Sequence, residues 1–199
     1  ALSILVAKDT DGSVRVVVAN YACHCTTLGH QINEHHGDWA GFAQEALEQD
    51  HPGAVAMITI GCGADSNPSP RGGEDFGMAL AKAHGRALAT EAGRVMAGEL
   101  KPLPRLPLTA MRRFDLPFQA LPTREEWEKR AKESGIVGYH ARKNLARLDR
   151  GEALPTTLPY SVVAWRFGDG FSMVFLPGEV VVDYALRLKG DLPDDALWI

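Results

Sequence analysis

Three side chains of the kinds used in hydrolytic sites, His24, Ser66 and Glu179, each follow an apolar segment of the chain. Open α/β sheets gather their ligand-binding groups at the carboxyl ends of their strands. A histidine and a glutamate there could bind a metal ion that polarises a carbonyl or activates water. The three loops could therefore supply two zinc ligands and a hydroxyl close to a reacting carbonyl.

The sequence around His24 also allows structural roles. His24 stands between Cys23 and Cys25, so a buried, hydrogen-bonded histidine and a Cys-His-Cys zinc knot are both alternatives. Adjacent residues of an extended chain point to opposite faces, and no second cysteine pair completes a tetrahedral site. The knot is therefore disfavoured, while the structural histidine remains open.

Ser66 and Glu179 have structural alternatives as well. Ser66 lies in the glycine-rich loop 61–73, where the glycines allow close approach of a ligand to the backbone amides. The loop matches neither a Gly-x-Ser-x-Gly elbow nor a phosphate-binding loop, and a turn serine is the plain alternative. Glu179 is expected in the first turn of a helix, where the helix dipole favours a carboxylate.

Four polar residues precede the next apolar segment. His30, His35 and His36 could form a metal cluster, a solvated loop or a helix cap. Asp38 is interpreted as the N-cap of the following helix, because its carboxylate can accept the free N–H groups of the first turn.

The segments that position these loops predict an α/β fold with a mixed sheet and flanking helices. A turn-rich segment separates strands at 2–7 and 14–22, which indicates a hairpin. Apolar residues at helical spacing follow from 38 to about 49. The continuous apolar run 54–60 suits a strand buried on both faces. A long helix with many small residues is expected from 76 to about 96.

The second half of the chain predicts a further strand at 108–118 and a capping box at Thr123 and Glu126 that opens a charged helical region reaching about 150. We interpret this region as an excursion on the surface. Strands at 160–167 and 171–176 flank Gly168-Asp169-Gly170, a hairpin turn. A helix starting near Gly178 would place Val181, Tyr184 and Leu188 on one face. No repeat or linker interrupts residues 1–199, so one domain is expected.

Composition excludes several classes of function. The 199 residues are 45% hydrophobic and 23% charged, which is typical of a globular domain. A formal net charge of -4 leaves no excess of Lys and Arg for nucleic acid or an anionic membrane surface. No apolar run reaches the roughly 20 residues that cross a bilayer. Three cysteines are too few for a disulfide framework. The N-terminus has no signal-peptide pattern and is read as a start inside a longer protein.

Four motifs in order resemble the catalytic domain of neutral/alkaline, non-lysosomal ceramidases. They are Asn20-Tyr21-Ala22-Cys23-His24-Cys25-Thr26-Thr27, Gly37-Asp38-Trp39-Ala40-Gly41-Phe42-Ala43, Gly63-Ala64-Asp65-Ser66-Asn67-Pro68 and Leu176-Pro177-Gly178-Glu179. No single motif is diagnostic, and the ordered set carries the resemblance. Asn67-Pro68 reverses the family's Pro-Asn order, and Cys25 stands where many members have Pro.

The resemblance implies that His24 and Glu179 bind Zn²⁺ and that Ser66 lies at the reacting amide. The implied reaction is hydrolysis of the N-acyl bond of ceramide or a related N-acyl lipid. The family's other zinc ligands, a histidine of a His-x-His segment and a tyrosine, have no match here, so they are expected in missing N- and C-terminal parts of the same polypeptide. Secretion or a periplasmic location is a further implication. A metal-independent serine hydrolase with His24 as base, or a non-catalytic binding or structural module, is the alternative.

Overall fold

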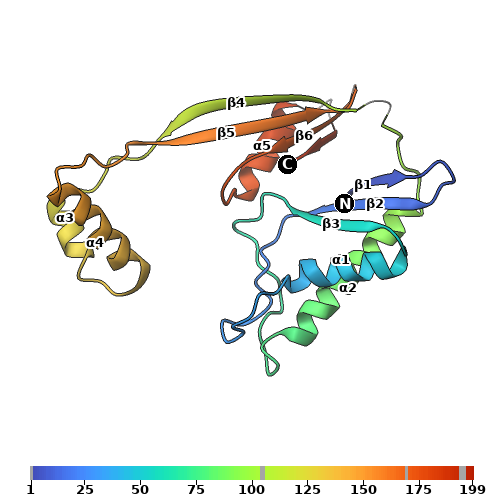
Figure 1. Cartoon of the computed structure of the whole chain (residues 1–199), viewed down its shortest axis with the longest axis horizontal. Helices are drawn as coiled ribbons and strands as arrows, with labels where there is room; N and C mark the ends of the chain where they lie inside the picture. The colour runs from blue at the N-terminus through green and yellow to red at the C-terminus, as the bar shows by residue number, and fades with distance from the viewer. Residues whose placement is uncertain (1, 104–105, 169, 193–195) are drawn as a thin grey trace. The chain divides into compact units, whose positions relative to one another are not determined.

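The computed structural model describes residues 2–103, 106–168, 170–192 and 196–199. The chain divides into two compact units, the first formed by Ala1–Ala110 and Val163–Ile199 and the second by Met111–Val162. Two mixed sheets and five helices confirm the predicted α/β class (Figure 1). The assignment of residues 1–199 to one domain of a larger catalytic domain stays a prediction.

A three-stranded sheet forms the base of the first unit. Strands β1 (Ser3–Lys8) and β2 (Val14–Tyr21) pair antiparallel, which confirms the predicted hairpin. Strand β3 (Val55–Ile60) pairs with β2 in parallel, so the sheet order is β1-β2-β3. The parallel pair requires a crossover, and helix α1 (Asp38–Asp50) provides it.

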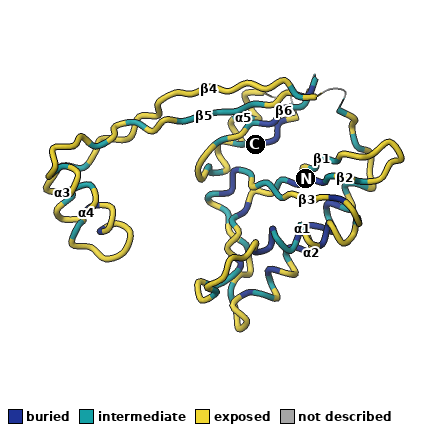
Figure 2. The backbone as a smooth tube through the Cα atoms, viewed as in Figure 1, coloured by how far each residue is buried: buried dark blue, intermediate teal, exposed yellow. Residues whose placement is uncertain are grey.

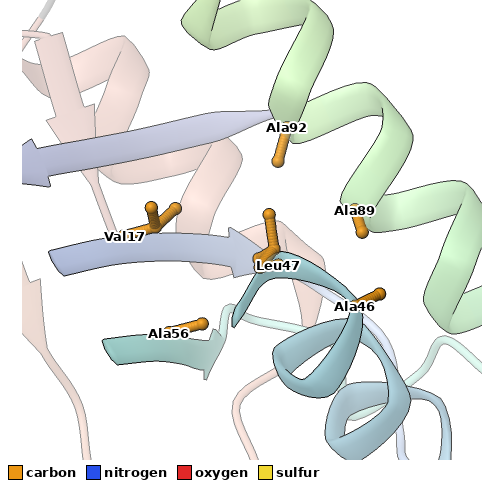
Figure 3. Close-up of a cluster of buried hydrophobic side chains, with 6 residues drawn as sticks. All are labelled: Val17, Ala46, Leu47, Ala56, Ala89 and Ala92. Carbon is orange, nitrogen blue, oxygen red and sulfur yellow. The ribbon is translucent and has the colours of Figure 1, made fainter. Parts of the chain in front are cut away.

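Helices α1 and α2 (Met78–Met96) cover one face of this sheet (Figure 1). Their buried side chains meet those of β2 and β3 in a tightly packed cluster (Figure 3). The cluster contains Val17, Ala46, Leu47, Ala56, Ala89 and Ala92. Four of the six are alanines, and such small side chains let the two helices lie close to the strands and to each other.

The expectation that β3 is buried on both faces is wrong. Ala56 is 2% exposed, whereas its neighbours Val55 and Met57 are 56% and 46% exposed. Successive side chains of a strand point to opposite faces, and α1 and α2 cover only one of them. Strand β3 is also an edge strand of its sheet, so burial is concentrated instead in β2 and the two helices (Figure 2).

The second sheet has the order β4-β5-β6-β7, built from β4 (Leu108–Pro117), β5 (Thr157–Arg166), β6 (Phe171–Phe175) and β7 (Ala196–Trp198). The antiparallel pairing of β5 with β6 confirms the second hairpin, although Asp169 of its predicted turn lies outside the described residues. Strand β7 pairs with β6 in parallel and was not predicted.

The first unit contains a second apolar cluster, on the other side of β2. Val18 packs there with Phe167, Met173 and Trp198. Helix α5 (Val182–Asp191) follows β6 and begins four residues after the predicted start at Gly178. The first sheet is thus packed by helices on one face and by the β6–β7 region on the other.

The second unit holds helices α3 (Arg124–Arg130) and α4 (Gly135–Asp149). The capping box predicted at Thr123 and Glu126 is confirmed, with both reciprocal hydrogen bonds present. Residues 131–134 divide the charged region into two helices, and most of both is exposed (Figure 2). In the part of the chain that the structure describes, no helix is long and apolar enough to cross a membrane.

Candidate active site

Three loops at strand ends are joined by hydrogen bonds in the first unit. The loop after β2 carries His24, whose N–H donates to the carbonyl of Ser66 in the loop after β3 at 2.9 Å. The loop after β6 is joined to the same loop twice. The N–H of Ala64 donates to the carbonyl of Val180 at 3.1 Å, and the N–H of Val182 donates to Asp65 Oδ1 at 3.1 Å. The structure therefore brings together the three loops that the sequence singled out.

The imidazole of His24 is held by a backbone carbonyl. His24 Nε2 lies 2.8 Å from the carbonyl oxygen of Ala64. A carbonyl oxygen only accepts, so in the neutral ring this hydrogen bond places the proton on Nε2 and leaves the lone pair on Nδ1. Histidines that bind metals characteristically donate their other ring N–H to a carbonyl or carboxylate. His24 therefore has the arrangement of a metal ligand that would bind through Nδ1.

A residue of α1 holds the main chain of His24 by a hydrogen bond. Trp39, only 2% exposed, donates its indole N–H to the carbonyl of His24 at 2.9 Å. The Trp39 ring also meets the ring of Tyr21 edge-on, with centroids 5.4 Å apart. Sequence reasoning missed this role because the donor and the carbonyl are fifteen residues apart and no local pattern connects them.

Asp38 is buried, at 3% exposure, and its carboxylate accepts two backbone hydrogen bonds. Oδ2 accepts from the N–H of Leu28 at 2.9 Å, and Oδ1 accepts from the N–H of Trp39 at 2.6 Å. The N-cap position is Gly37, so Asp38 is not the predicted N-cap, although its carboxylate does accept the first-turn N–H of Trp39. A φ of +53° at Asp38 turns the carboxylate toward the His24 loop instead.

The three loop histidines take no part in a cluster. His36 Nδ1 accepts from the N–H of Asp38 at 2.9 Å, and its ring packs against Phe42. His30 and His35 are exposed. Within the described ranges, no group of three His, Cys, Asp or Glu side chains could hold a metal ion. His30 and His35 thus match the exposed-loop alternative, whereas His36 accepts the N–H of the first residue of α1, as a helix cap would.

Ser66 does not share a cavity with Glu179. It lines a cavity of about 810 Å³ together with Trp39, His84 and Lys189. Burial raises the pKa of the Cys23 thiol, and a hydrogen bond between that thiol and Ser66 opposes the rise. In the described part of the chain, the Ser66 hydroxyl has no hydrogen bond to a histidine or carboxylate that could serve as its base. The feature required by a serine hydrolase with His24 as base is thus missing from the observed contacts.

Glu179 is exposed and lies outside any helix, so its placement in the first turn of a helix is wrong. Gly178 has a φ of +85°, which turns the chain sharply, and α5 starts only after Val181. Glu179 lines a mostly apolar cavity of about 680 Å³ that His24 also lines. The two predicted zinc ligands therefore share a cavity, and Ser66 opens onto a different one.

The residues present fit part of a zinc site. His24 Nδ1 has no hydrogen bond to a described residue, its ring is held by the carbonyl of Ala64, and Glu179 offers a carboxylate in the same cavity. Catalytic zinc sites use three protein ligands and keep a further position open. Two candidate ligands are therefore one short of the usual minimum.

Comparison with known proteins identifies structures of similar fold. No protein-family model matches the chain, and no curated protein sequence matches it. The crystal structure of neutral ceramidase from Pseudomonas aeruginosa is similar with a TM-score of 0.60 and 15% identity, over 99% of this chain and 38% of that one. A ceramidase complexed with C2 is similar with a TM-score of 0.63 and 16% identity, over 100% of this chain and 40% of that one. The chain thus spans about two fifths of these proteins, and the likeness shows a shared fold.

Proposed function

We propose that this chain is part of a zinc-dependent amidohydrolase that cleaves the N-acyl bond of ceramide or a related N-acyl lipid. The observation that carries the proposal is the position of His24 and Glu179, which come from separate strand ends and line one apolar cavity. The likeness in fold to two ceramidases and the ordered motifs support the same reaction class.

In this proposal His24 binds zinc through Nδ1 while its Nε2–H stays on the carbonyl of Ala64. Glu179 supplies a carboxylate ligand, and the remaining ligands come from parts of the polypeptide beyond this chain. Zinc bound there would polarise the amide carbonyl and lower the pKa of a bound water.

The cavity walls suit an aliphatic substrate. Leu5, Val18, Met57 and Trp198 present apolar side chains to the cavity that His24 and Glu179 line. An acyl chain placed among them would leave water, which is favourable in proportion to the apolar area buried. The apolar surroundings would also strengthen the electrostatic interactions of His24 and Glu179 with the reacting amide.

Ser66 lines the other cavity, and its proposed role rests on the ordered motifs. Its backbone carbonyl accepts a hydrogen bond from the N–H of His24, so the Ser66 loop is bonded directly to the loop of the proposed metal ligand. We propose that its hydroxyl approaches the reacting amide when substrate and the remaining ligands are in place. The family resemblance also suggests a secreted or periplasmic location.

The test is zinc content and turnover of fluorogenic N-acyl amides, measured on the polypeptide that contains this chain. His24→Ala and Glu179→Ala should each remove zinc and abolish turnover, while His84→Ala, at a histidine outside the proposed zinc site, should keep the zinc. If the protein turns over substrate without bound metal, and Ser66→Ala abolishes that turnover, the serine-hydrolase alternative is correct instead. Folded protein with no turnover on any amide would establish the binding or structural module.

A further inference from the structure

The second unit has the opposite charge to the rest of the chain. Met111–Val162 contains ten Lys and Arg residues and seven Asp and Glu residues. The remaining residues contain eleven Lys and Arg and eighteen Asp and Glu. The chain's net charge of -4 therefore averages a cationic unit with a strongly anionic one. The net charge of the whole chain argued against an anionic membrane surface as a partner. That argument does not apply to the second unit, whose own charge is positive.

The positive charge is concentrated in residues 129–143, here called the cationic tip. Its cationic residues are Lys129, Arg130, Lys132, Arg142 and Lys143, and Glu133 is its one carboxylate. Several acidic side chains of the unit lie outside the tip in ion pairs with arginines. Lys132 and Lys143 form no ion pair with any described residue. Their charges are therefore left uncompensated.

Exposed apolar side chains lie within the same segment. Ile136 is 75% exposed, Val137 51% and Tyr139 52%. Ile136, Tyr139 and Lys143 are spaced three and four residues apart on α4 and share one face. The Nζ of Lys143 lies 5.6 Å from the centre of the Tyr139 ring. The tip thus presents aliphatic and aromatic groups next to lysines.

The buried face of α4 is formed by other residues than the exposed apolar ones. Gly138 and Ala141 are the buried residues of α4, and a Cβ at Gly138 would collide with the carbonyl of Glu133. Arg142 Nη1 donates to the carbonyl of Ala131 at 2.7 Å, which fixes the connection between α3 and α4. With this inner face occupied, Ile136 and Val137 have no inward position available.

We propose that the cationic tip docks on the surface of an anionic lipid bilayer. Ile136, Val137 and Tyr139 enter the headgroup region, and the lysines lie against the anionic headgroups, as in interfacial amphipathic helices. Charge complementarity favours this occupant, because a polybasic cluster is attracted to anionic lipid. A second copy bound tip to tip is disfavoured, since two cationic tips repel each other, and a copy bound through its anionic first unit would appear as a dimer in solution.

The test is sedimentation of the 199-residue chain with vesicles of phosphatidylcholine containing about 30% phosphatidylglycerol, beside vesicles of phosphatidylcholine alone. We expect binding to the anionic vesicles that falls steeply as salt rises, because exposed charges are screened. Lys132→Glu/Lys143→Glu should lower the partition coefficient about 30-fold or more, given the gain expected for each basic residue near such a surface. Ile136→Ser should lower it about fivefold.

Matched variants separate the tip from general charge and hydrophobicity. Lys8→Glu/Lys101→Glu makes the same change in net charge within the first unit, and Leu106→Ser removes an apolar side chain that is 90% exposed. Both should bind as the parent does, and circular dichroism should show every variant folded. Equal loss in the control and tip variants would overturn the proposal. So would an absence of vesicle binding, or a dimer in solution that Ile136→Ser dissociates.

Discussion

The indole N–H of Trp39 donates to the carbonyl of His24 at 2.9 Å, which couples the first turn of α1 to the candidate metal ligand. The neighbouring carboxylate of Asp38 accepts from the N–H of Leu28, four residues further along the same loop. Two consecutive residues of α1 therefore hold the loop at two points, His24 and Leu28. The position of His24 depends on the packing of a helix as well as on the strand that precedes it.

Replacing Trp39 with Phe should destabilise the fold and loosen His24. The ring would still pack in the buried site, but the part-buried carbonyl of His24 would lose its indole donor and keep only the weak thiol donor of Cys23 at 3.6 Å, which costs about 1 kcal/mol or more. The measurement is the free energy of unfolding in urea. Trp165→Phe, at a residue 38% exposed, is the matched control and should change it by less than about 1 kcal/mol. Equal effects at both positions would contradict the role given to the indole N–H.

Asp38→Asn tests the buried carboxylate without changing its shape. Asparagine tolerates the positive φ of this position, but it has one acceptor oxygen where the carboxylate uses two. One of the two backbone N–H groups would then face the amide nitrogen, at a cost of about 1–3 kcal/mol. Urea unfolding should show this loss, while Asp11→Asn in the exposed β1–β2 turn should show little change. A neutral result at Asp38 would mean that water or a shifted loop satisfies both donors.

Sequence reasoning succeeded where the signal is local. The β-branched residues of β1 and β2, the helical spacing in α1 and the capping box at Thr123 are each local features of the sequence. These features depend on neighbours a few residues away, which is the range over which sequence patterns carry information. The succession of β2, α1 and β3 indicated an α/β arrangement, whereas the order of the strands in the sheet was not predicted.

The site depended on contacts that the sequence does not encode locally. The carbonyl of Ala64 meets His24 across forty residues, and a backbone carbonyl has no residue-specific signal. Glu179 was placed in a helix because apolar residues at helical spacing predicted one from Gly178, but the φ of Gly178 and the late start of α5 decide otherwise. The burial of β3 was overestimated because its apolar residues face a cavity on one side.

Asp75 should make α2 sensitive to acid. Its carboxylate accepts from the N–H of Ala79 at 2.7 Å and of Gly77 at 3.1 Å, and the bond to Ala79 chiefly holds the pKa of Asp75 below its ordinary value of 3.8. A lowered pKa in the folded state gives stability that is complete above the ordinary value and is lost as pH falls below it. Urea midpoints from pH 6 to pH 2.5 should show this loss. Asp75→Asn should be less stable at pH 6 and should converge with the parent at the acid end. A constant difference across that range would contradict the assignment.

Two glycines of α2 should respond in opposite directions to the same substitution. A Cβ at Gly85 would lie 2.6 Å from Phe42 Cβ and 2.7 Å from the carbonyl of Trp39, so Gly85→Ala must push α1 away. A Cβ at Gly93 meets nothing within 4 Å. Gly93→Ala should therefore stabilise the helix by about 0.5–1 kcal/mol, whereas Gly85→Ala should cost about 1–3 kcal/mol through overpacking.

The displacement of α1 gives the Gly85 variant a second effect, because α1 carries Trp39 and Asp38. If the His24 loop is held as described, Gly85→Ala should weaken zinc binding by the polypeptide that contains this chain, and Gly93→Ala should leave it unchanged. Urea unfolding and competition with a zinc chelator measure the two effects separately. A Gly85 variant that is destabilised but binds zinc as tightly as the parent would show that the loop keeps its position without α1, and that Trp39 and Asp38 serve stability alone.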